Sequence, residues 1–417
     1  MTGHISGLDA RMVLDSRGQP TVEVDCFVDG ALSGRAIVPS GASTGAYEAL
    51  ELRDGDPSMY LGKGVSAAVN NVKDRIEQVL VGLPVDEQRI IDDAMIKLDG
   101  TPNKSELGAN AMLGASMACL HAGATLHELP LWKYIGGASG GLMPVPMLNI
   151  LNGGAHAASN VDVQEFMVMP HGFDTFQDGL RAGVETYHAL KAELKKDGLL
   201  GGVGDEGGFA PNLPANEDGL KYMVRAIEGA GYSTEEIGIA LDVASTEFLK
   251  DDGYHMDGKV LSSDDLVELY GGWLDRYPIL SIEDGFGEDD WRGWSSFTKA
   301  YGHRVQTVGD DLFVTQSERL SKGIELGAAN AMLVKVNQVG TVSETLEAMD
   351  LASTNGMNNV VSHRSGESED VTIADFAVGT RAGQIKTGAP ARSDRVAKYN
   401  QLLRIAEDVQ DYRSPFN

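Results

Sequence analysis

Hydrophobic and polar residues alternate with the period of a β-strand near the start of the chain. Residues 21–28 (TVEVDCFV) show this alternation, Asp29-Gly30 is a typical hairpin turn, and residues 31–39 (ALSGRAIVP) have the pattern of a returning strand. Three stretches with helical patterns follow, at residues 65–81, 86–98 and 108–127. The pattern therefore predicts an α+β arrangement for the first third of the chain.

A change in composition marks the end of this part. Residues 136–141 (GGASGG) have the composition of a linker, and Pro144 and Pro146 follow at the start of the next segment. We therefore expect two domains, residues 1–137 and residues 138–417.

Short apolar strands alternate with helix-length stretches in the second domain. The helical stretches include residues 264–277 and 342–353. The predicted strands are residues 163–169, 237–243, 278–284, 305–311, 331–336, 359–364 and 383–388. Repeated strand–helix units predict parallel strands, and hence an α/β fold.

Most of these strands carry an ionisable residue at or near their C-terminal end. These residues are Asp242, Glu283, Asp310, Lys335, His363 with Arg364, and Lys386, and successive members lie 23 to 41 residues apart. Each interval is about one strand, one helix and two loops, so the units would bring these residues to one rim. A closed TIM-like β/α barrel places its chemistry on that rim. A doubly wound open sheet is the competing fold, but the chain has neither GxGxxG after a first strand nor GxxxxGK(S/T).

The net charge of the chain argues against binding to nucleic acids or to anionic membrane surfaces. The 417 residues include 34 Lys and Arg against 61 Asp and Glu, a formal charge of −27, and such a surface repels nucleic-acid phosphates and anionic lipids. We therefore expect no nucleic-acid partner. No segment approaches the roughly 18 apolar residues of a membrane span, and the N-terminus lacks a signal-peptide pattern, so we expect no membrane span and a cytoplasmic location. The two cysteines, Cys26 and Cys119, are interpreted as buried small hydrophobic residues.

Three of the rim residues are carboxylates on separate strands. Asp242, Glu283 and Asp310 would repel one another strongly unless a cation lay between them, and oxygen ligands favour Mg²⁺ or Mn²⁺. Each acid alone is more often a helix N-cap or a loop residue, but the set at barrel spacing favours a metal site. The neighbouring Asp284 and Asp311 either cap the following helices or support other groups of the site.

Two lysines share the predicted rim with these acids. Lys335 lies in the apolar strand AMLVKV and Lys386 in QIKTG, where a buried lysine is costly unless its charge is used or suppressed. Each positive charge at this rim, from the other lysine or from a divalent ion, would lower the pKa of a lysine beside it. A neutral amine would then be available as a general base. The alternative role is an ion pair with a barrel carboxylate.

Further candidates have weaker signals. Glu206 (VGDEGGFAP) and Glu165 (VQEFMV) are candidates for protonating a leaving group, although a glycine-flanked acid is usually a turn residue. His156 (NGGAHA) is ambiguous. His363-Arg364-Ser365 (SHRSG) suits a phosphate or carboxylate, with an arginine–acid bridge as the alternative.

A run of small residues at 40–45 (SGASTG) is either a flexible loop or a lid that reaches a metal when it closes. In the lid interpretation, hydroxyl and carbonyl oxygens of this run would be the metal ligands. His121 and His127, near the end of a predicted helix, are interpreted as structural.

The chain resembles the enolases over essentially its whole length. The matching motifs are LDSRGQPTVEV, GRAIVPSGASTGAYEALELRD, LGANAMLG, PVPMLNILNGGAHA, VQEFMVMP, VGDEGGFAPNL, SIEDGFGEDDW, VGDDLFVT, VKVNQVGT, SHRSGESED and GQIKTGAPARSDRVAKYNQLLRI. The resemblance implies an N-terminal α+β capping domain with a mobile loop, a C-terminal barrel, and Mg²⁺-dependent reversible dehydration of 2-phospho-D-glycerate to phosphoenolpyruvate in glycolysis and gluconeogenesis. It also implies a homodimer or a homo-octamer.

The resemblance also implies a role for each motif residue. Lys335 takes the proton beside the carboxylate, and Glu206, assisted by Glu165, protonates the departing hydroxyl. Asp242, Glu283 and Asp310 would bind the first Mg²⁺, and Ser40 would help to bind the second. Arg364 and Ser365 would bind the substrate phosphate. His156, His363 and Lys386 would contact the rest of the substrate. The resemblance thus implies a site for two Mg²⁺ ions and a small phosphorylated acid.

The chain departs from the family pattern at two positions. Gln19 and Gln316 stand where the family usually has asparagine, at positions without an assigned chemical role.

Two alternative functions compete with this one. A racemase or cycloisomerase of the same superfamily would carry a KxK pair on an early barrel strand, where this chain has Glu165 in VQEFMVM. A second class is a protein-binding role, because enolases also act at cell surfaces and in RNA-processing assemblies.

Overall fold

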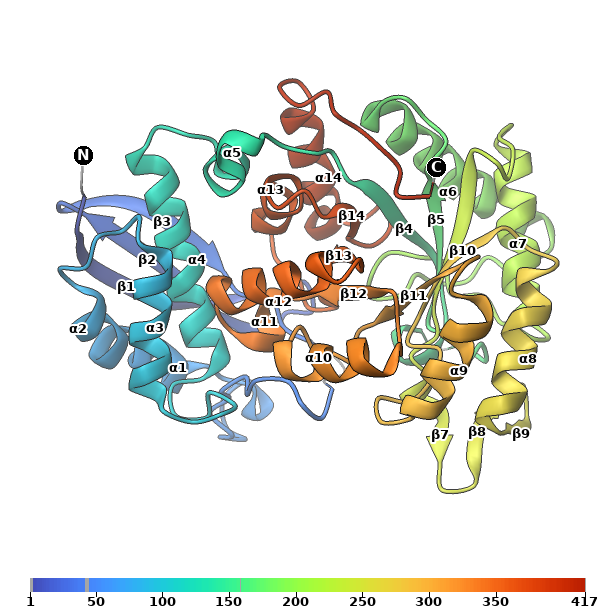
Figure 1. The fold of residues 1–417 in the computed structure, drawn as a ribbon, viewed down its shortest axis with the longest axis horizontal. Helices are drawn as coiled ribbons and strands as arrows, with labels where there is room; N and C mark the ends of the chain where they lie inside the picture. Colours follow the sequence, from blue (N-terminus) through green and yellow to red (C-terminus); the bar gives the residue numbers. More distant parts are fainter. Residues whose placement is uncertain (1–2, 42–44, 158, 417) are drawn as a thin grey trace.

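The computed structural model describes residues 3–41, 45–157 and 159–416, and its two parts lie side by side (Figure 1). The first part contains a three-stranded antiparallel sheet of β1 (Ile5–Leu14), β2 (Pro20–Val28) and β3 (Ala31–Ile37). The predicted hairpin is therefore confirmed as β2 and β3, whereas the pattern analysis did not identify β1. Both faces of β2 are covered, since eight of its nine residues are buried.

Helices cover this sheet on one side. They are α1 (Ser66–Asn71), a π-helical turn (Val72–Ile76), α2 (Glu77–Leu80), α3 (Gln88–Asp99) and α4 (Ala109–Leu126). Helix α5 (Leu131–Gly136) follows them and packs against α13 (Thr372–Gly379) of the barrel. The predicted helix at 65–81 thus forms as one run with a π-helical turn in its middle. Helix α4 is apolar nearly all round because β2 and β3 cover one side of it while α3 and the barrel cover others. On the sheet side the approach is close, since a Cβ atom on Gly34 would come within 2.0 Å of the Ala118 carbonyl oxygen.

The second part is a closed eight-stranded barrel. In the order of hydrogen-bonded neighbours the strands are β10 (Ile279–Glu283), β11 (Gln306–Gly309), β12 (Ala331–Val334), β13 (Asn358–Ser362), β14 (Gly383–Lys386), β4 (Val145–Asn152), β5 (Glu165–Pro170) and β6 (Ile237–Asp242). The predicted α/β barrel is therefore confirmed, and the open doubly wound sheet is excluded.

One predicted feature of the barrel is wrong. Strand β5, within predicted residues 163–169, runs antiparallel to both neighbours, β4 and β6. The reason is that the described part of the connection from β4 to β5 contains only a single 3₁₀ turn (Gly154–His156). A parallel return needs a longer crossover, usually through a helix.

The outer layer of the barrel consists of helices and one small hairpin sheet (Figure 1). The helices are α6 (Phe176–Lys196), α7 (Asn216–Gly229), α8 (Ser263–Leu274), α9 (Trp291–Tyr301), α10 (Ser317–Leu326), α11 (Val336–Val339), α12 (Val342–Thr354), α13 (Thr372–Gly379) and α14 (Ser393–Ile405). The small sheet consists of β7 (Leu249–Lys250), β8 (Gly253–Met256) and β9 (Lys259–Leu261). Side-chain caps at Thr175, Ser262, Asp290 and Thr341 begin four of the helices.

Polar contacts join the two parts at the start of α12. The buried Asp92 carboxylate on α3 accepts hydrogen bonds from the Ser343 amide (2.9 Å) and hydroxyl (2.7 Å). Lys104 forms an ion pair with Glu344 at 2.9 Å. The first part of the chain is therefore anchored to the barrel by buried charged groups.

Two further sequence expectations can be compared with the structure. Cys26 and Cys119 are both buried and free, with their Sγ atoms 3.8 Å apart, so the prediction that they are buried is confirmed. Among the described residues, no helix has the length and apolar character that crossing a membrane requires.

Candidate active site

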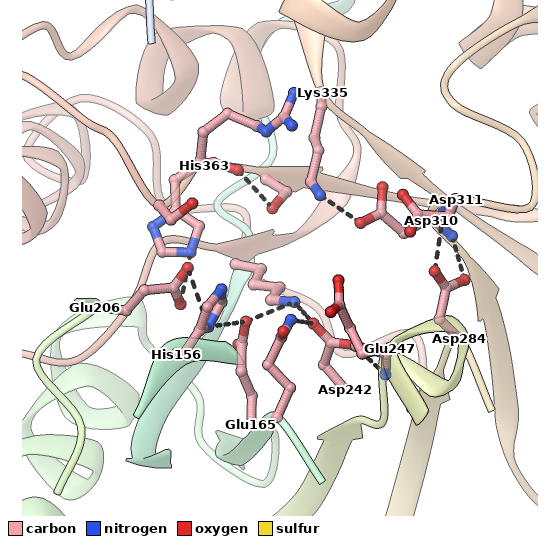
Figure 2. Close-up of a pocket in the computed structure, with 16 residues that line it drawn as sticks. His156, Glu165, Glu206, Asp242, Glu247, Asp284, Asp310, Asp311, Lys335 and His363 are labelled. Atoms are coloured by element: carbon pink, nitrogen blue, oxygen red, sulfur yellow. Dashed lines mark hydrogen bonds and ion pairs between the residues drawn. The ribbon is translucent and has the colours of Figure 1, made fainter. Parts of the chain in front are cut away.

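The C-terminal ends of the barrel strands converge on one polar pocket (Figure 2). Asp242, Glu283 and Lys386 are the last residues of β6, β10 and β14, while Asp310, Lys335 and His363 directly follow β11, β12 and β13. Ten of the twelve residues predicted for the site line this pocket. Of the other two, Glu283 lies fully buried behind Lys386, and Ser40 lies beside the pocket.

Glu165 reaches the same rim for a different reason. It is the first residue of β5, and because β5 is antiparallel, its N-terminal end lies where the other strands end. The register pairs Glu165 with Asp242 on one side and with Asn152 on the other. The reversal of β5 therefore adds a carboxylate to the rim that a uniformly parallel barrel would place at the opposite end.

Lys386 lies at the centre of three buried carboxylates. Its Nζ atom is 2.9 Å from Asp242 Oδ2, 2.9 Å from Glu283 Oε1 and 3.2 Å from Glu165 Oε1. Burial disfavours the charged ammonium, but these carboxylates raise the pKa of Lys386 well above its ordinary value. One ammonium thus offsets part of the negative charge of three acids.

Lys335 forms an ion pair with Asp310 on the other side of the pocket. Burial opposes its charge, yet Asp310 raises the pKa of Lys335 above the ordinary value. The depressed lysine pKa expected from the sequence is therefore not produced by the protein's own charges. The alternative, an ion pair with a barrel carboxylate, is what the geometry shows for Lys335.

Four acidic residues gather where the neighbouring strands β10 and β11 end. The Asp284 carboxylate accepts hydrogen bonds from the backbone amides of Asp310 and Asp311, both at 2.9 Å, so it braces the turn after β11 and does not cap a helix. Burial, together with neighbouring acids, raises the pKa of Asp284 and of Glu283 well above their ordinary values. Burial and the adjacent Asp310 raise the pKa of Asp311 to about 8.

Two histidines and two glutamates form the opposite wall (Figure 2). Glu206 Oε2 accepts a hydrogen bond from Asn149 Nδ2 at 3.0 Å and lies 3.1 Å from His363 Nε2. His156 Nδ1 is 3.5 Å from Glu165 Oε1 and 3.8 Å from Glu206 Oε1. Burial and the nearby Glu206 raise the pKa of Glu165 well above its ordinary value, whereas burial lowers the pKa of His363 to about 4.

Comparison with protein families identifies the chain. A model of the enolase C-terminal TIM barrel domain matches residues 141–415, and a model of the enolase N-terminal domain matches residues 5–135. The chain belongs to the enolase family. The resemblance inferred from the motifs is confirmed, and membership identifies the protein as an enzyme of the lyase class.

In this enolase-family chain, Arg364 joins the rim to the N-terminal domain. Its guanidinium donates to both carboxylate oxygens of Glu48, at 3.0 and 3.1 Å, and to Asn337 Oδ1 at 2.9 Å. The arginine–acid bridge foreseen as an alternative is therefore present. Arg364 and Ser365 also line the pocket, so a phosphate-binding role stays a prediction.

Ser40 lies beside the Arg364 loop. Its backbone pairs with Gly366, and its hydroxyl donates to Asp15 Oδ2 at 3.0 Å while accepting from Arg17 at 3.0 Å. Residues 42–44 of the predicted lid lie outside the described residues. The metal role predicted for Ser40 therefore requires its hydroxyl to exchange these partners.

Sequence reasoning missed several residues of the site. Gln164 lines the pocket and donates to Asp242 Oδ2 at 3.2 Å, and Glu247 lines it from a 3₁₀ turn (Ser245–Phe248) with an exposed side chain. Asn149, on the inner face of β4, holds Glu206. Only Gln164, which directly precedes the chosen Glu165, had a local signal that could have identified it.

Proposed function

We propose that this chain catalyses the reversible dehydration of 2-phospho-D-glycerate to phosphoenolpyruvate, as a Mg²⁺-dependent member of the enolase family. The observation that carries the proposal is the placement of Lys335 and Glu206 around one pocket, with an excess of buried carboxylates between them. Removal of a proton and of a hydroxyl from adjacent carbons needs a base and an acid that face the same substrate.

The carboxylates of the pocket suit a divalent cation. Glu283 and Asp311 have raised pKa values because the neighbouring acids add to the effect of burial, and Glu165 Oε2 is buried without a hydrogen-bond partner in the described structure. Oxygen-only donors favour Mg²⁺. Asp242, Glu283 and Asp310 would hold the first Mg²⁺, and Ser40 would contribute to the second. When bound, Mg²⁺ supplies positive charge that stabilises the negative charge developing on the substrate carboxylate.

The protein groups account for the proton transfers. Because Asp310 raises the pKa of Lys335, the base role requires Asp310 to be engaged by the bound metal, so that its charge no longer favours the ammonium. Lys335 Nζ would then be a neutral amine, take the proton from the carbon beside the carboxylate and become an ammonium.

Glu206 then gives a proton to the departing hydroxyl, which leaves as water, and Glu206 becomes a carboxylate. Because, against the effect of burial, the nearby histidines and Arg395 hold the pKa of Glu206 well below its ordinary value, this step requires Glu206 to gain its proton in the substrate complex. Glu165 acts beside Glu206, and His156 lies close to both glutamates.

Binding of a phosphorylated acid falls to the remaining groups of the rim. Arg364 and Ser365 would hold the phosphate, for which Arg364 would share its guanidinium between Glu48 and the substrate. His156, His363 and Lys386 would contact the rest of the molecule. We also propose a cytoplasmic homo-oligomer, a dimer or an octamer, which light scattering coupled to size-exclusion chromatography would distinguish.

An absorbance assay tests this function. The purified protein is mixed with 2-phosphoglycerate, and phosphoenolpyruvate formation is followed with Mg²⁺, without Mg²⁺ and with a chelator. We expect product only when Mg²⁺ is present, and the reverse reaction when phosphoenolpyruvate is supplied. Absence of Mg²⁺-dependent product would overturn the proposal.

A further inference from the structure

Arg395 is a fully buried cation behind the pocket wall. It lies in the first turn of α14 (Ser393–Ile405), with 0% of its surface exposed. Its guanidinium nitrogen NH1 lies 2.5 Å from His363 Nδ1 and donates to the Arg364 carbonyl at 2.5 Å, and NH2 donates to the Ser365 carbonyl at 2.6 Å. Its Nε atom is 2.9 Å from Asp394 Oδ2. The guanidinium therefore contacts the backbone and a ring nitrogen of the His363–Ser365 loop.

The contact with the imidazole determines where the histidine carries its proton. A guanidinium only donates hydrogen bonds and keeps its protons at any physiological pH. His363 Nδ1 must therefore be the acceptor and carry no hydrogen. A neutral imidazole has one N–H group, which then lies on Nε2, the nitrogen that faces Glu206 Oε2 at 3.1 Å.

The negative charges around His363 favour its doubly protonated, positively charged form. Glu206 faces Nε2, Glu367 lies farther along the same loop, and His156 faces Glu206 from the other side. A carboxylate close to a histidine favours the doubly protonated imidazolium. Arg395 opposes this, because protonation of Nδ1 would place an N–H against a guanidinium N–H. The pKa of His363, lowered to about 4 by burial and by Arg395 against the effect of Glu206, agrees with the geometry.

We propose that Arg395 is a positioning residue that keeps His363 a neutral imidazole with its proton on Nε2, the ring nitrogen that lies 3.1 Å from Glu206 Oε2. An imidazolium at this position would form an ion pair with Glu206 and hold it as a carboxylate. Against the effect of burial, His363, His156 and Arg395 already hold the pKa of Glu206 well below its ordinary value, and a neutral imidazole lowers that pKa less than an imidazolium would. This consequence for catalysis rests on the proposed function, whereas the protonation state of His363 does not.

Nitrogen spectroscopy of the histidine ring tests the protonation state directly. The full-length protein is labelled with ¹⁵N-histidine, and magic-angle-spinning ¹⁵N spectra at pH 7 distinguish protonated from unprotonated ring nitrogens. The resonances of His363 are those lost in His363→Gln. We expect one unprotonated Nδ1 and one protonated Nε2. A proton on Nδ1 in the unmodified protein, in either the neutral or the doubly protonated ring, would overturn the proposal.

Substitution of Arg395 tests its part in this state. In Arg395→Met, which cannot donate, we expect His363 to gain a proton on Nδ1 at pH 7, and in Arg395→Lys, which keeps a cation and a donor, we expect the unmodified pattern. Tyr399→Phe is the matched control. Tyr399 is also buried on α14 and donates to the Gly388 carbonyl at 2.6 Å, with no hydrogen bond or ion pair to His363 in the described structure.

The results separate the proposal from a purely structural role and from the proposed function. Unchanged His363 resonances in folded Arg395→Met would overturn the proposal, as would an equal change in Tyr399→Phe. If Arg395→Met does not fold, protonation of Nδ1 in Arg395→Lys would contradict the proposal, because that variant retains a donor. Since the spectra need no turnover, a protein without dehydratase activity still gives the answer.

Discussion

The Lys386 ammonium lies 2.9 and 3.0 Å from the two carboxylate oxygens of Glu283 at the bottom of the pocket. Both side chains are almost completely buried, with 2% and 0% of their residue surfaces exposed. Asp242 and Glu165 share the same ammonium. This arrangement makes Lys386 the internal counter-ion of the proposed Mg²⁺ ligands, so its removal should couple stability to the metal.

We predict that Lys386→Met lowers the free energy of unfolding by about 3–5 kcal/mol in the presence of a chelator, because it leaves buried carboxylates without a counter-ion. Mg²⁺ should then stabilise the variant more than the unmodified protein. Urea denaturation with chelator and with Mg²⁺ measures both effects. Lys104→Met is the control, because it removes a buried lysine that is paired with Glu344 outside the site. Its decrease in the free energy of unfolding should not depend on Mg²⁺. An equal Mg²⁺ response in all three proteins would contradict the prediction.

Lys335→Ala is expected to reduce turnover by at least about 10³-fold while the protein stays folded, because the proposed base is removed and general-base catalysis is typically worth 10²–10⁴-fold. The phosphoenolpyruvate assay gives the rate, and circular dichroism checks the fold. Lys104→Ala, at a buried lysine remote from the pocket, should retain near-normal turnover. Near-normal activity of Lys335→Ala would reject its assignment as the base.

Much of the rim could be predicted from the sequence because parallel strands all end on one side of a barrel. A charged residue after an apolar strand, as at Asp242, Asp310 and Lys335, therefore maps to the rim without knowledge of any contact. The same logic gave the wrong direction for β5, the strand that carries Glu165, because strand direction depends on the length of the connection before it. The place of Glu165 in the pocket follows from the antiparallel pairing of β5 and not from the strand pattern.

The supporting groups could not be predicted in the same way. Asn149 lies inside an apolar strand and Arg395 in a polar helical stretch, and neither pattern indicates that the side chain touches Glu206 or His363. Such contacts depend on tertiary distances between segments far apart in the chain. The contact of Arg364 with Glu48 likewise depends on the docking of two domains, which the strand pattern does not specify. The contact of Ser40 with Asp15 joins two separate segments of the N-terminal domain.

The buried Asp92 at the domain contact gives a pH-dependent prediction. Burial raises the pKa of Asp92 above its ordinary value, and hydrogen bonds from Ser116 and Ser343 only partly oppose this. Between the unfolded-state pKa, about 4, and the raised native pKa, the native state binds more protons than the unfolded state. The contribution of Asp92 to stability should therefore be greatest below about pH 4 and should fall as the pH rises through the native pKa.

Measurement of unfolding free energies from pH 4 to pH 8 for the unmodified protein and Asp92→Asn tests this. We expect the stability of the unmodified protein relative to Asp92→Asn to decrease as the pH rises, by about 1.4 kcal/mol for each unit of pKa difference. Asp93→Asn, at the exposed neighbouring position, is the control. A difference between the unmodified protein and Asp92→Asn that is constant with pH, or that grows, would contradict a raised pKa.

Glu206→Gln separates the two proton transfers of the proposed reaction. The amide keeps the shape of the side chain but cannot give a proton to the departing hydroxyl, so we expect dehydration to fall by about 10²–10⁴-fold. Lys335 is unchanged and lies across the pocket, so exchange of the substrate proton beside the carboxylate with solvent deuterium should continue. Proton NMR of 2-phosphoglycerate in D₂O follows exchange and dehydration in one sample.

The control for this variant is Glu247→Gln, because Glu247 is an exposed carboxylate that lines the same pocket without a role in either transfer. Its dehydration rate should stay within about threefold of the unmodified rate, a change of under 1 kcal/mol in the activation free energy. Loss of exchange together with dehydration in Glu206→Gln would place Glu206 in proton abstraction. Retention of full dehydration would instead leave the leaving-group acid to Glu165, whose pKa burial raises and which therefore carries a proton more readily.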